Sequence, residues 1–118
     1  AKRRNMKAAI YLAEHLHEAP VHLFVAGWTR RGAPQSQALF PAIQNVLLAC
    51  RAVGLGASLT TAHRADGEEI DRYLGLDPVK TPSIALIPIG WPKGNFGRPT
   101  RRSIDTCFFV DSVPEPSD

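Results

Sequence analysis

Cysteine is scarce in this sequence of 118 residues, which contains only Cys50 and Cys107. The two lie far apart, and neither has a second cysteine or a histidine beside it at the spacing of a zinc ligand. The composition therefore supports neither a disulfide framework nor a zinc site. Reduced thiols fit the cytoplasm best, so we expect a cytoplasmic protein.

Long hydrophobic runs are also lacking. The longest apolar stretches fall well short of the roughly 20 residues that span a bilayer. The basic start, AKRRNMK, leads into AAIYLAEHLHEAP, where glutamate and histidine residues interrupt the apolar core that a secretion signal needs. We therefore expect no membrane partner.

Acidic residues are missing between Asp77 and Asp105, whereas this stretch holds the cations Lys80, Lys93, Arg98, Arg101 and Arg102. The net charge of +3 is too mild by itself to indicate nucleic acid binding. Within the stretch, KGNFGRPTRR fits a solvated hairpin, a nucleic acid patch with Phe96 as stacking ring, or a clamp for one phosphate group. Arg101 and Arg102 suit a phosphate because a guanidinium fork binds two oxygens at once.

The chain length predicts one domain, in which helices alternate with strands. The patterns predict helices over 5–18, from Ser36 to Gly54 and over 67–75, and strands over 21–28, 82–90 and 107–110. Asp66 with Glu69 predicts a capping box for the third helix. We expect an α+β or α/β layered fold over residues 1–113 and a disordered tail over 114–118.

The two longer strands are both strongly apolar. Residues 82–90 are predicted to be central until Pro88, where the missing N–H favours a strand end or a bulge. The near-continuous apolarity of residues 21–28 predicts an interior position in the sheet.

The helix that starts at Ser36 is apolar on two faces. One comprises Leu39, Ile43, Val46, Cys50 and Val53, and the other Phe40, Leu47 and Leu48. We therefore expect this helix to be covered on most sides. Gln44 and Asn45 are either buried amides that a neighbouring loop satisfies or amides aimed at a ligand. Gln37, Gln44 and Arg51 share one face of the helix. A third interpretation is that this face is simply exposed to solvent.

Two common motifs are rejected. GLGASL, from Gly54, begins like a dinucleotide-binding turn but follows a helix, and Leu59 occupies the slot of the third glycine. The four histidines, His15, His17, His22 and His63, offer no metal geometry. We expect no metal site.

Six segments together resemble the nitroreductase family of FMN-dependent oxidoreductases. They are AAIYLAEHLHEAPVHLFV, RGAP, FPAIQNVLLACRAVGLGASLTTAH, EEIDRYLGL, IALIPIGWP and GRPTRR. The resemblance extends from about Ala8 to Val113 and implies an α+β sandwich that binds FMN at the interface of a homodimer. It also implies reduction by NADH or NADPH and reoxidation by a nitro compound, a quinone or a similar acceptor. The chemistry would then belong to the cofactor, which accounts for the lack of an evident acid, base or nucleophile.

The resemblance also implies roles for individual residues. Leu59 would pack on the flavin ring and the Thr61 backbone N–H would point at flavin N5, with Thr60 and Ala62 beside it. The remaining matches are Gln44 and Asn45, at helix positions near the cofactor, and Arg101, Arg102 and more weakly Arg98, as cations that hold the FMN phosphate.

The chain departs from the family at its start. The Arg- and Ser-rich segment that supplies much of the flavin site in the family is absent, so the resemblance implies a truncated domain, the C-terminal half only. An alternative is a truncated non-catalytic interaction or structural protein that has lost flavin binding. A second alternative is a small basic nucleic acid binder, although we expect no nucleic acid partner.

Overall fold

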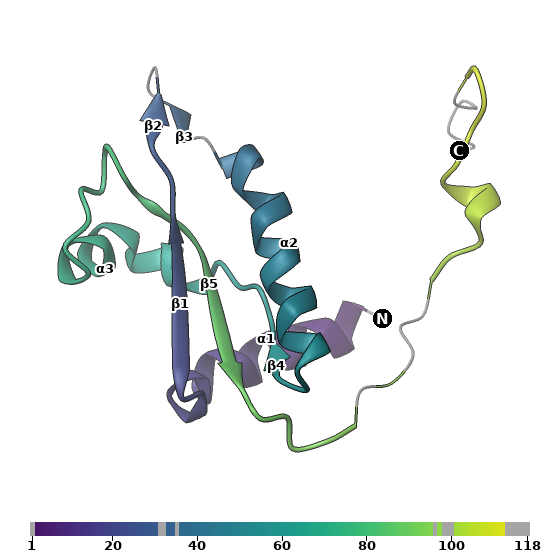
Figure 1. Ribbon diagram of the computed structural model, residues 1–118, viewed down its shortest axis with the longest axis horizontal. Coiled ribbons are helices and arrows are strands. Elements are labelled where there is room, and N and C mark those ends of the chain that lie inside the picture. The colour runs from purple at the N-terminus through teal and green to yellow at the C-terminus, as the bar shows by residue number, and fades with distance from the viewer. Residues whose placement is uncertain (1, 31–32, 35, 96, 98–100, 113–118) are drawn as a thin grey trace.

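A computed structural model of the chain describes residues 2–30, 33–34, 36–95, 97 and 101–112. Arg98, Phe96 and the predicted tail at 114–118 lie outside these residues. The described part contains helices and a three-stranded antiparallel sheet, with strand order β1-β5-β4. This arrangement is the α+β fold expected from the sequence (Figure 1).

Strand β5 (Ser83–Gly90) forms the centre of the sheet, as predicted, because its side chains are apolar on both faces. It pairs along its length with β1 (Val21–Ala26), from Val21 opposite Ile89 to Val25 opposite Ala85. On its other side it pairs with the short β4 (Gly56–Ala57). The core of the described molecule lies on this strand, where Leu86 and Ile87 are fully buried.

Two predictions about the sheet were wrong. Strand β5 continues through Pro88 to Gly90, because Ile89 and Gly90 still pair with β4 beyond the proline. The irregular register lies instead in β1, between Val25 and Ala26. Strand β1 is at an edge of the described sheet, not in its interior, since apolarity along a strand reports covered faces and not a neighbour at both edges.

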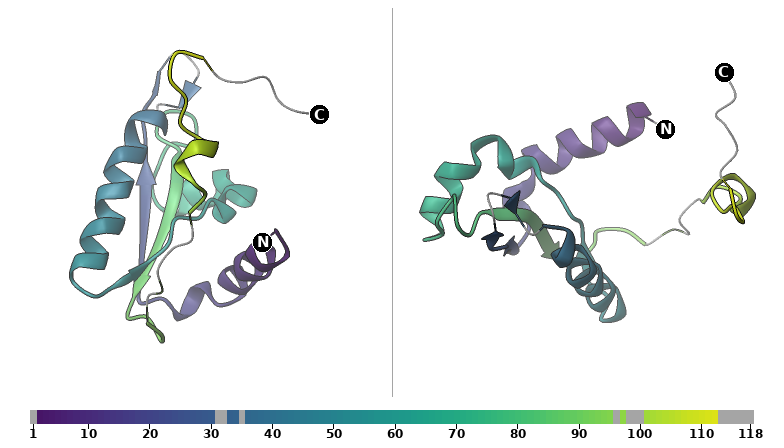
Figure 2. Two further views of the ribbon diagram at one scale, coloured as in Figure 1. Left: turned by 90° about the vertical axis from the view of Figure 1, so that its right-hand side faces the viewer. Right: turned by 90° about the horizontal axis from the view of Figure 1, so that it is seen from above.

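Helix α2 (Ser36–Ala52) covers one face of the sheet, and α1 and α3 lie on the opposite side (Figure 2). Ile43 of α2 packs against Ala85 and Ile87. The prediction that α2 is covered on most sides was wrong: within the described chain Phe40, Leu48 and Val53 are exposed. The helix ends at Ala52, and Gly54, which the sequence placed at its end, follows with a φ of +82° that only glycine adopts without strain.

The helix predicted over 5–18 is α1 (Lys2–Glu14) followed by a 3₁₀ turn, η1 (Leu16–Glu18). Met6, Ile10 and Tyr11 of this helix are at least half exposed in the described chain. No helix of the described residues is both long and apolar enough to cross a membrane.

A 3₁₀ helix, η2 (Ala62–Asp66), leads into α3 (Gly67–Tyr73). The predicted capping box was wrong, since Asp66 makes no side-chain cap: the preceding 3₁₀ turn holds its ψ at 35°, away from the extended backbone of a capping residue. Gly75, with φ of +74°, follows the helix as predicted.

Two further segments lie outside the main sheet. The sequence TRRGAPQS contains the short paired strands β2 (Thr29–Arg30) and β3 (Ala33–Pro34). Residues 107–110, predicted as a strand, pair with no strand of the described residues and follow a 3₁₀ turn, η3 (Ile104–Thr106). All described residues of 101–112 are exposed, and the segment lies apart from the sheet (Figures 1 and 2).

Candidate functional site

The segment Leu59–Ala62, which the sequence singles out, lies between β4 and η2 and is attached to the central strand. Thr60 donates its N–H to the Leu86 carbonyl and accepts the Leu86 N–H, both at 2.9 Å. Leu59 is half-buried and packs on the core cluster of Ile43, Ala85 and Ile87. The segment is therefore held as an additional one-residue bridge on β5.

Thr61 and Ala62 turn outward from this bridge and are exposed. The Ala62 N–H donates to Thr60 Oγ1 at 3.2 Å, and the Thr61 carbonyl accepts the Arg64 N–H at 2.9 Å. The Thr61 N–H has no hydrogen-bond partner among the described residues. The segment thus presents the Thr61 backbone donor to its surroundings.

A buried carboxylate fixes the residues that follow. Asp71 of α3 is fully buried and accepts hydrogen bonds from the Ser83 N–H, at 3.0 Å, and from the Ser83 hydroxyl. Arg64 Nη1 donates to the Ser83 carbonyl at 2.8 Å and lies 3.4 Å from Asp71 Oδ2. This Arg64–Asp71–Ser83 cluster ties η2 and α3 to the beginning of β5.

The Arg64–Asp71–Ser83 cluster is not among the residues predicted from the sequence. One signal was available: Gly67, Ile70, Asp71 and Leu74 are spaced as one helix face, so Asp71 falls in a stripe that otherwise predicts burial. A carboxylate in such a stripe indicates a buried partner.

The two amides of α2, Gln44 and Asn45, do not lie with the Leu59–Ala62 segment. Gln44 and Asn45 are exposed on α2, so the interpretation as buried amides was wrong. Gln37 and Arg51 are exposed as well, which confirms the solvent face. The described chain does not gather these residues with Leu59–Ala62 around one cavity.

The arginine pair is likewise separate. Arg101 and Arg102 belong to the segment that lies apart from the sheet, and Arg98 is outside the described residues (Figure 1). Within one copy of the chain the pair and the Leu59–Ala62 segment do not form a single pocket.

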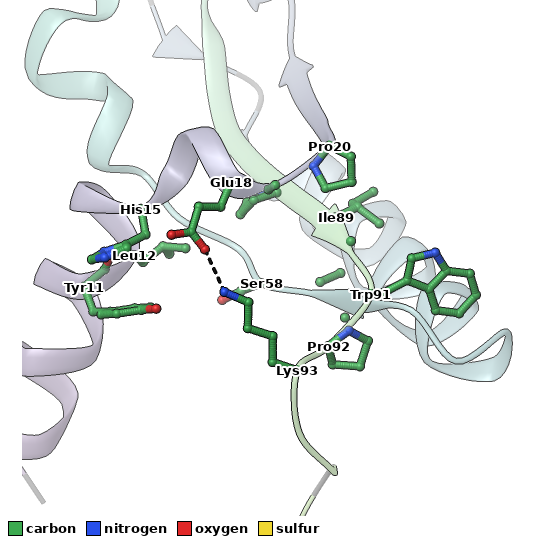
Figure 3. A pocket seen from close by; sticks show the side chains of 15 residues that line it. Tyr11, Leu12, His15, Glu18, Pro20, Ser58, Ile89, Trp91, Pro92 and Lys93 are labelled. Atoms are coloured by element: carbon green, nitrogen blue, oxygen red, sulfur yellow. Dashed lines mark hydrogen bonds and ion pairs between the residues drawn. The ribbon is translucent and has the colours of Figure 1, made fainter.

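A cavity of about 500 Å³ lies between α1 with η1 on one side and β4 with the end of β5 on the other (Figure 3). Tyr11 and His15 stack on its wall, with ring centroids 3.9 Å apart. Lys93 donates to Glu18 at 3.0 Å across its mouth.

Among the described residues, no group of three or more His, Cys, Asp or Glu side chains could hold a metal ion.

The hydrogen bond and the charge of Lys93 hold the pKa of Glu18 below its ordinary value of 4.5. We expect Lys93→Met to raise the pKa of Glu18 towards 4.5, measured by NMR titration of the side-chain carboxyl carbon. Lys80→Met is the matched control, because Lys80 contacts Asp77 and not Glu18. An unchanged Glu18 titration in Lys93→Met would show that the contact is absent in solution.

A model of the nitroreductase family matches residues 2–91. The chain belongs to the nitroreductase family. The position of this match does not bear out the expectation that the likeness is to the C-terminal half only. It also ends at Trp91, before the GRPTRR segment that was expected to belong to the resemblance.

No curated protein and no solved structure gives a significant match. Membership of the nitroreductase family indicates an oxidoreductase, and proteins of this family generally bind flavin. Both Leu59–Ala62 and the Arg64–Asp71–Ser83 cluster lie inside the matched residues.

Proposed function

We propose that this nitroreductase-family chain is an FMN-dependent oxidoreductase that uses NADH or NADPH to reduce a nitro compound, a quinone or a similar acceptor. The observation that carries the proposal is the N–H of the exposed Thr61, which has no hydrogen-bond partner among the described residues and belongs to a segment anchored to β5. When bound, FMN would supply the hydride transfer chemistry, and the chain has only to hold and orient it.

The residues of the segment fit one side of a flavin ring. The Thr61 N–H would donate to flavin N5, and a donor there orients the ring and tunes its electronics. Leu59 would offer an apolar surface, with Thr60 and Ala62 beside it. The Thr60 N–H is already used by Leu86, which leaves Thr61 as the backbone donor of this pair of threonines.

The FMN phosphate would be held by Arg101 and Arg102, with Arg98 as a further candidate. Because residues 101–112 lie apart from the sheet, we propose that the pair serves the flavin site of a second copy in a homodimer (Figure 1). Gln44 and Asn45, exposed on α2, would lie near that interface.

The two unpaired cysteines, Cys50 and Cys107, support a reducing compartment such as the cytoplasm.

A non-catalytic interaction protein is the second candidate. It is favoured by the exposed apolar side chains on α1 and α2, among them Met6, Ile10, Phe40 and Leu48. Apolar groups in this number suit contacts with another protein surface. Uptake of flavin separates the two candidates.

Purified chain titrated with FMN should quench flavin fluorescence and retain a yellow colour after gel filtration. Arg101→Ala combined with Arg102→Ala should weaken FMN binding at least about tenfold, because charge-assisted hydrogen bonds contribute about 1.5–3 kcal/mol each. Riboflavin, which lacks the phosphate, should bind the double variant and the original chain equally.

Lys80→Ala is the control for that variant, since it removes a cation from the same acid-free stretch and should leave FMN affinity unchanged. Equal FMN affinity in the double variant would rule out the arginine pair as the phosphate site. A colourless chain that takes up no added FMN would favour the interaction protein.

A further inference from the structure

His63 is buried beside the proposed flavin segment without a hydrogen-bond partner. It is 8% exposed, and both ring nitrogens are covered and unpartnered in the described structure. Its ring meets Phe24 of β1 edge-on, with centroids 5.6 Å apart and planes at 86°. Such a site accepts a neutral imidazole as a packing group and disfavours an imidazolium, which needs acceptors or water.

The charged groups around His63 do not compensate for a proton. On η2 its neighbour is the Arg64 cation, and α3 contributes Asp71, whose oxygens already accept from Ser83 and lie near Arg64. Strand β5 has no ionisable side chain, and the one on β1, His22, donates its ring N–H to the Leu16 carbonyl at 2.8 Å. Burial and then Arg64 lower the pKa of His63 from its ordinary 6.5, although the Ser83 backbone and then Asp71 act in the opposite direction.

The position of His63 links its charge to the segment before it. His63 lies between Thr61, whose carbonyl accepts the Arg64 N–H, and Arg64, whose side chain is fixed on Ser83 and Asp71. We propose that His63 is an acid-sensitive latch: when protonated, it leaves its place against Phe24 and releases residues 61–64 from β5. If this segment holds FMN, as proposed above, the release also weakens flavin binding at acid pH.

The direction of the pH dependence follows from the difference in the pKa of His63 between the folded and the released chain. Because the pKa of His63 is lower in the folded chain than 6.5, the unfolded or released chain binds more protons between the two values. The stabilisation from the latch is therefore complete above pH 6.5 and is lost as the pH falls through the folded pKa.

Two measurements on the full chain test the latch itself. The His63 ring carbon-bound proton, followed by NMR, should titrate with a midpoint below 6.5, and a midpoint at or above 6.5 would overturn the proposal. Hydrogen exchange, corrected for the intrinsic pH dependence, should show several-fold lower protection of the Thr60 and Arg64 amides at about pH 5.5 than at about pH 7.5. Equal protection at the two pH values would also overturn it.

His63→Phe keeps a ring against Phe24 and cannot take up a proton, so the loss of protection at acid pH should disappear. His17→Phe is the matched control, because His17 is exposed on η1 and its replacement should leave the loss unchanged. If His63→Phe does not fold, His63→Leu serves the same purpose. If the loss of protection at acid pH persists in the His63 variants, another titrating group causes it and the proposal is overturned.

FMN titration at the same two pH values tests the consequence. We expect FMN binding at about pH 5.5 to weaken by several-fold more in the original chain and in His17→Phe than in His63→Phe, where only protonation of the FMN phosphate still weakens it. Normal acid release of residues 61–64 with no FMN binding at any pH would keep the latch and reject the proposed function. FMN binding without release of residues 61–64 at acid pH would reject the latch and keep the proposed function.

Discussion

Asp71→Ala should destabilise the chain by about 2–5 kcal/mol. The substitution takes the acceptor away from the Ser83 N–H and the Ser83 hydroxyl, which are both buried. Leaving a buried donor unsatisfied costs about 1–3 kcal/mol per group. Arg64 adds little to this cost, because its side chain is 44% exposed and water can solvate it. The expected loss is large against the 5–15 kcal/mol that stabilises a typical domain.

Urea unfolding followed by circular dichroism measures this effect, with Glu68→Ala as the matched control. Glu68 is also a carboxylate of α3 that pairs with an arginine, Arg72, but both side chains are mostly exposed. We expect its removal to change the unfolding midpoint little. Similar midpoints for the Asp71 and Glu68 variants would mean that the buried cluster is not formed in solution.

Ile87→Ala should cost a comparable amount, about 2–5 kcal/mol. Ile87 is fully buried in the centre of β5 and packs with Ile43 and Ala85 under α2. Its truncation removes apolar contacts and leaves a cavity that the flanking strands cannot close, and such core substitutions cost this much. The midpoint of urea unfolding should fall with an unchanged slope, and Ile87→Val should lose only about 0.5–1.5 kcal/mol.

Ile104→Ala provides the same chemical change at an exposed site. Ile104 is 67% exposed on η3, so its truncation should shift stability by no more than about 0.5 kcal/mol. A loss as large as that of Ile87→Ala would show that residues 101–112 pack against an apolar surface in solution.

Local patterns predicted the two elements that carry most of the fold. The apolar run of β5 indicated a central strand, and the spacing of Ile43 and Cys50 indicated the buried face of α2. The left-handed residues Gly54 and Gly75 were correctly placed after helices, because their conformation depends on a few neighbouring residues.

The errors concern contacts between distant parts of the chain. The pattern of β1 indicated covered faces but gave no information about a strand at its outer edge. The aromatic residues of 107–110 have a high strand propensity, but a strand requires a partner, and the described chain provides none. Propensity alone therefore predicted an element that pairing did not form.

The same limit applies to the candidate site. The resemblance indicated Leu59–Ala62, yet what fixes the residues that follow this segment is a carboxylate on α3 and a serine at the start of β5, twelve positions apart. The spacing of Asp71 on α3 indicates its burial, but helix or strand periodicity does not identify Ser83 as its partner, because Ser83 looks ordinary in its own element. In the proposed homodimer Arg101 and Arg102 serve the flavin site of a second copy, and periodicity within one sequence does not predict contacts between copies.

The outer edge of β1 has a practical consequence for handling the protein. No described strand pairs with this edge, and Val21 and Leu23 on it are exposed, so its backbone N–H and carbonyl groups offer a template for another extended chain. The irregular register between Val25 and Ala26 disturbs pairing only at the C-terminal end of β1, so residues 21–24 keep a regular edge. Aggregation at high concentration should therefore start from residues 21–24, and a lysine at Leu23 should improve solubility.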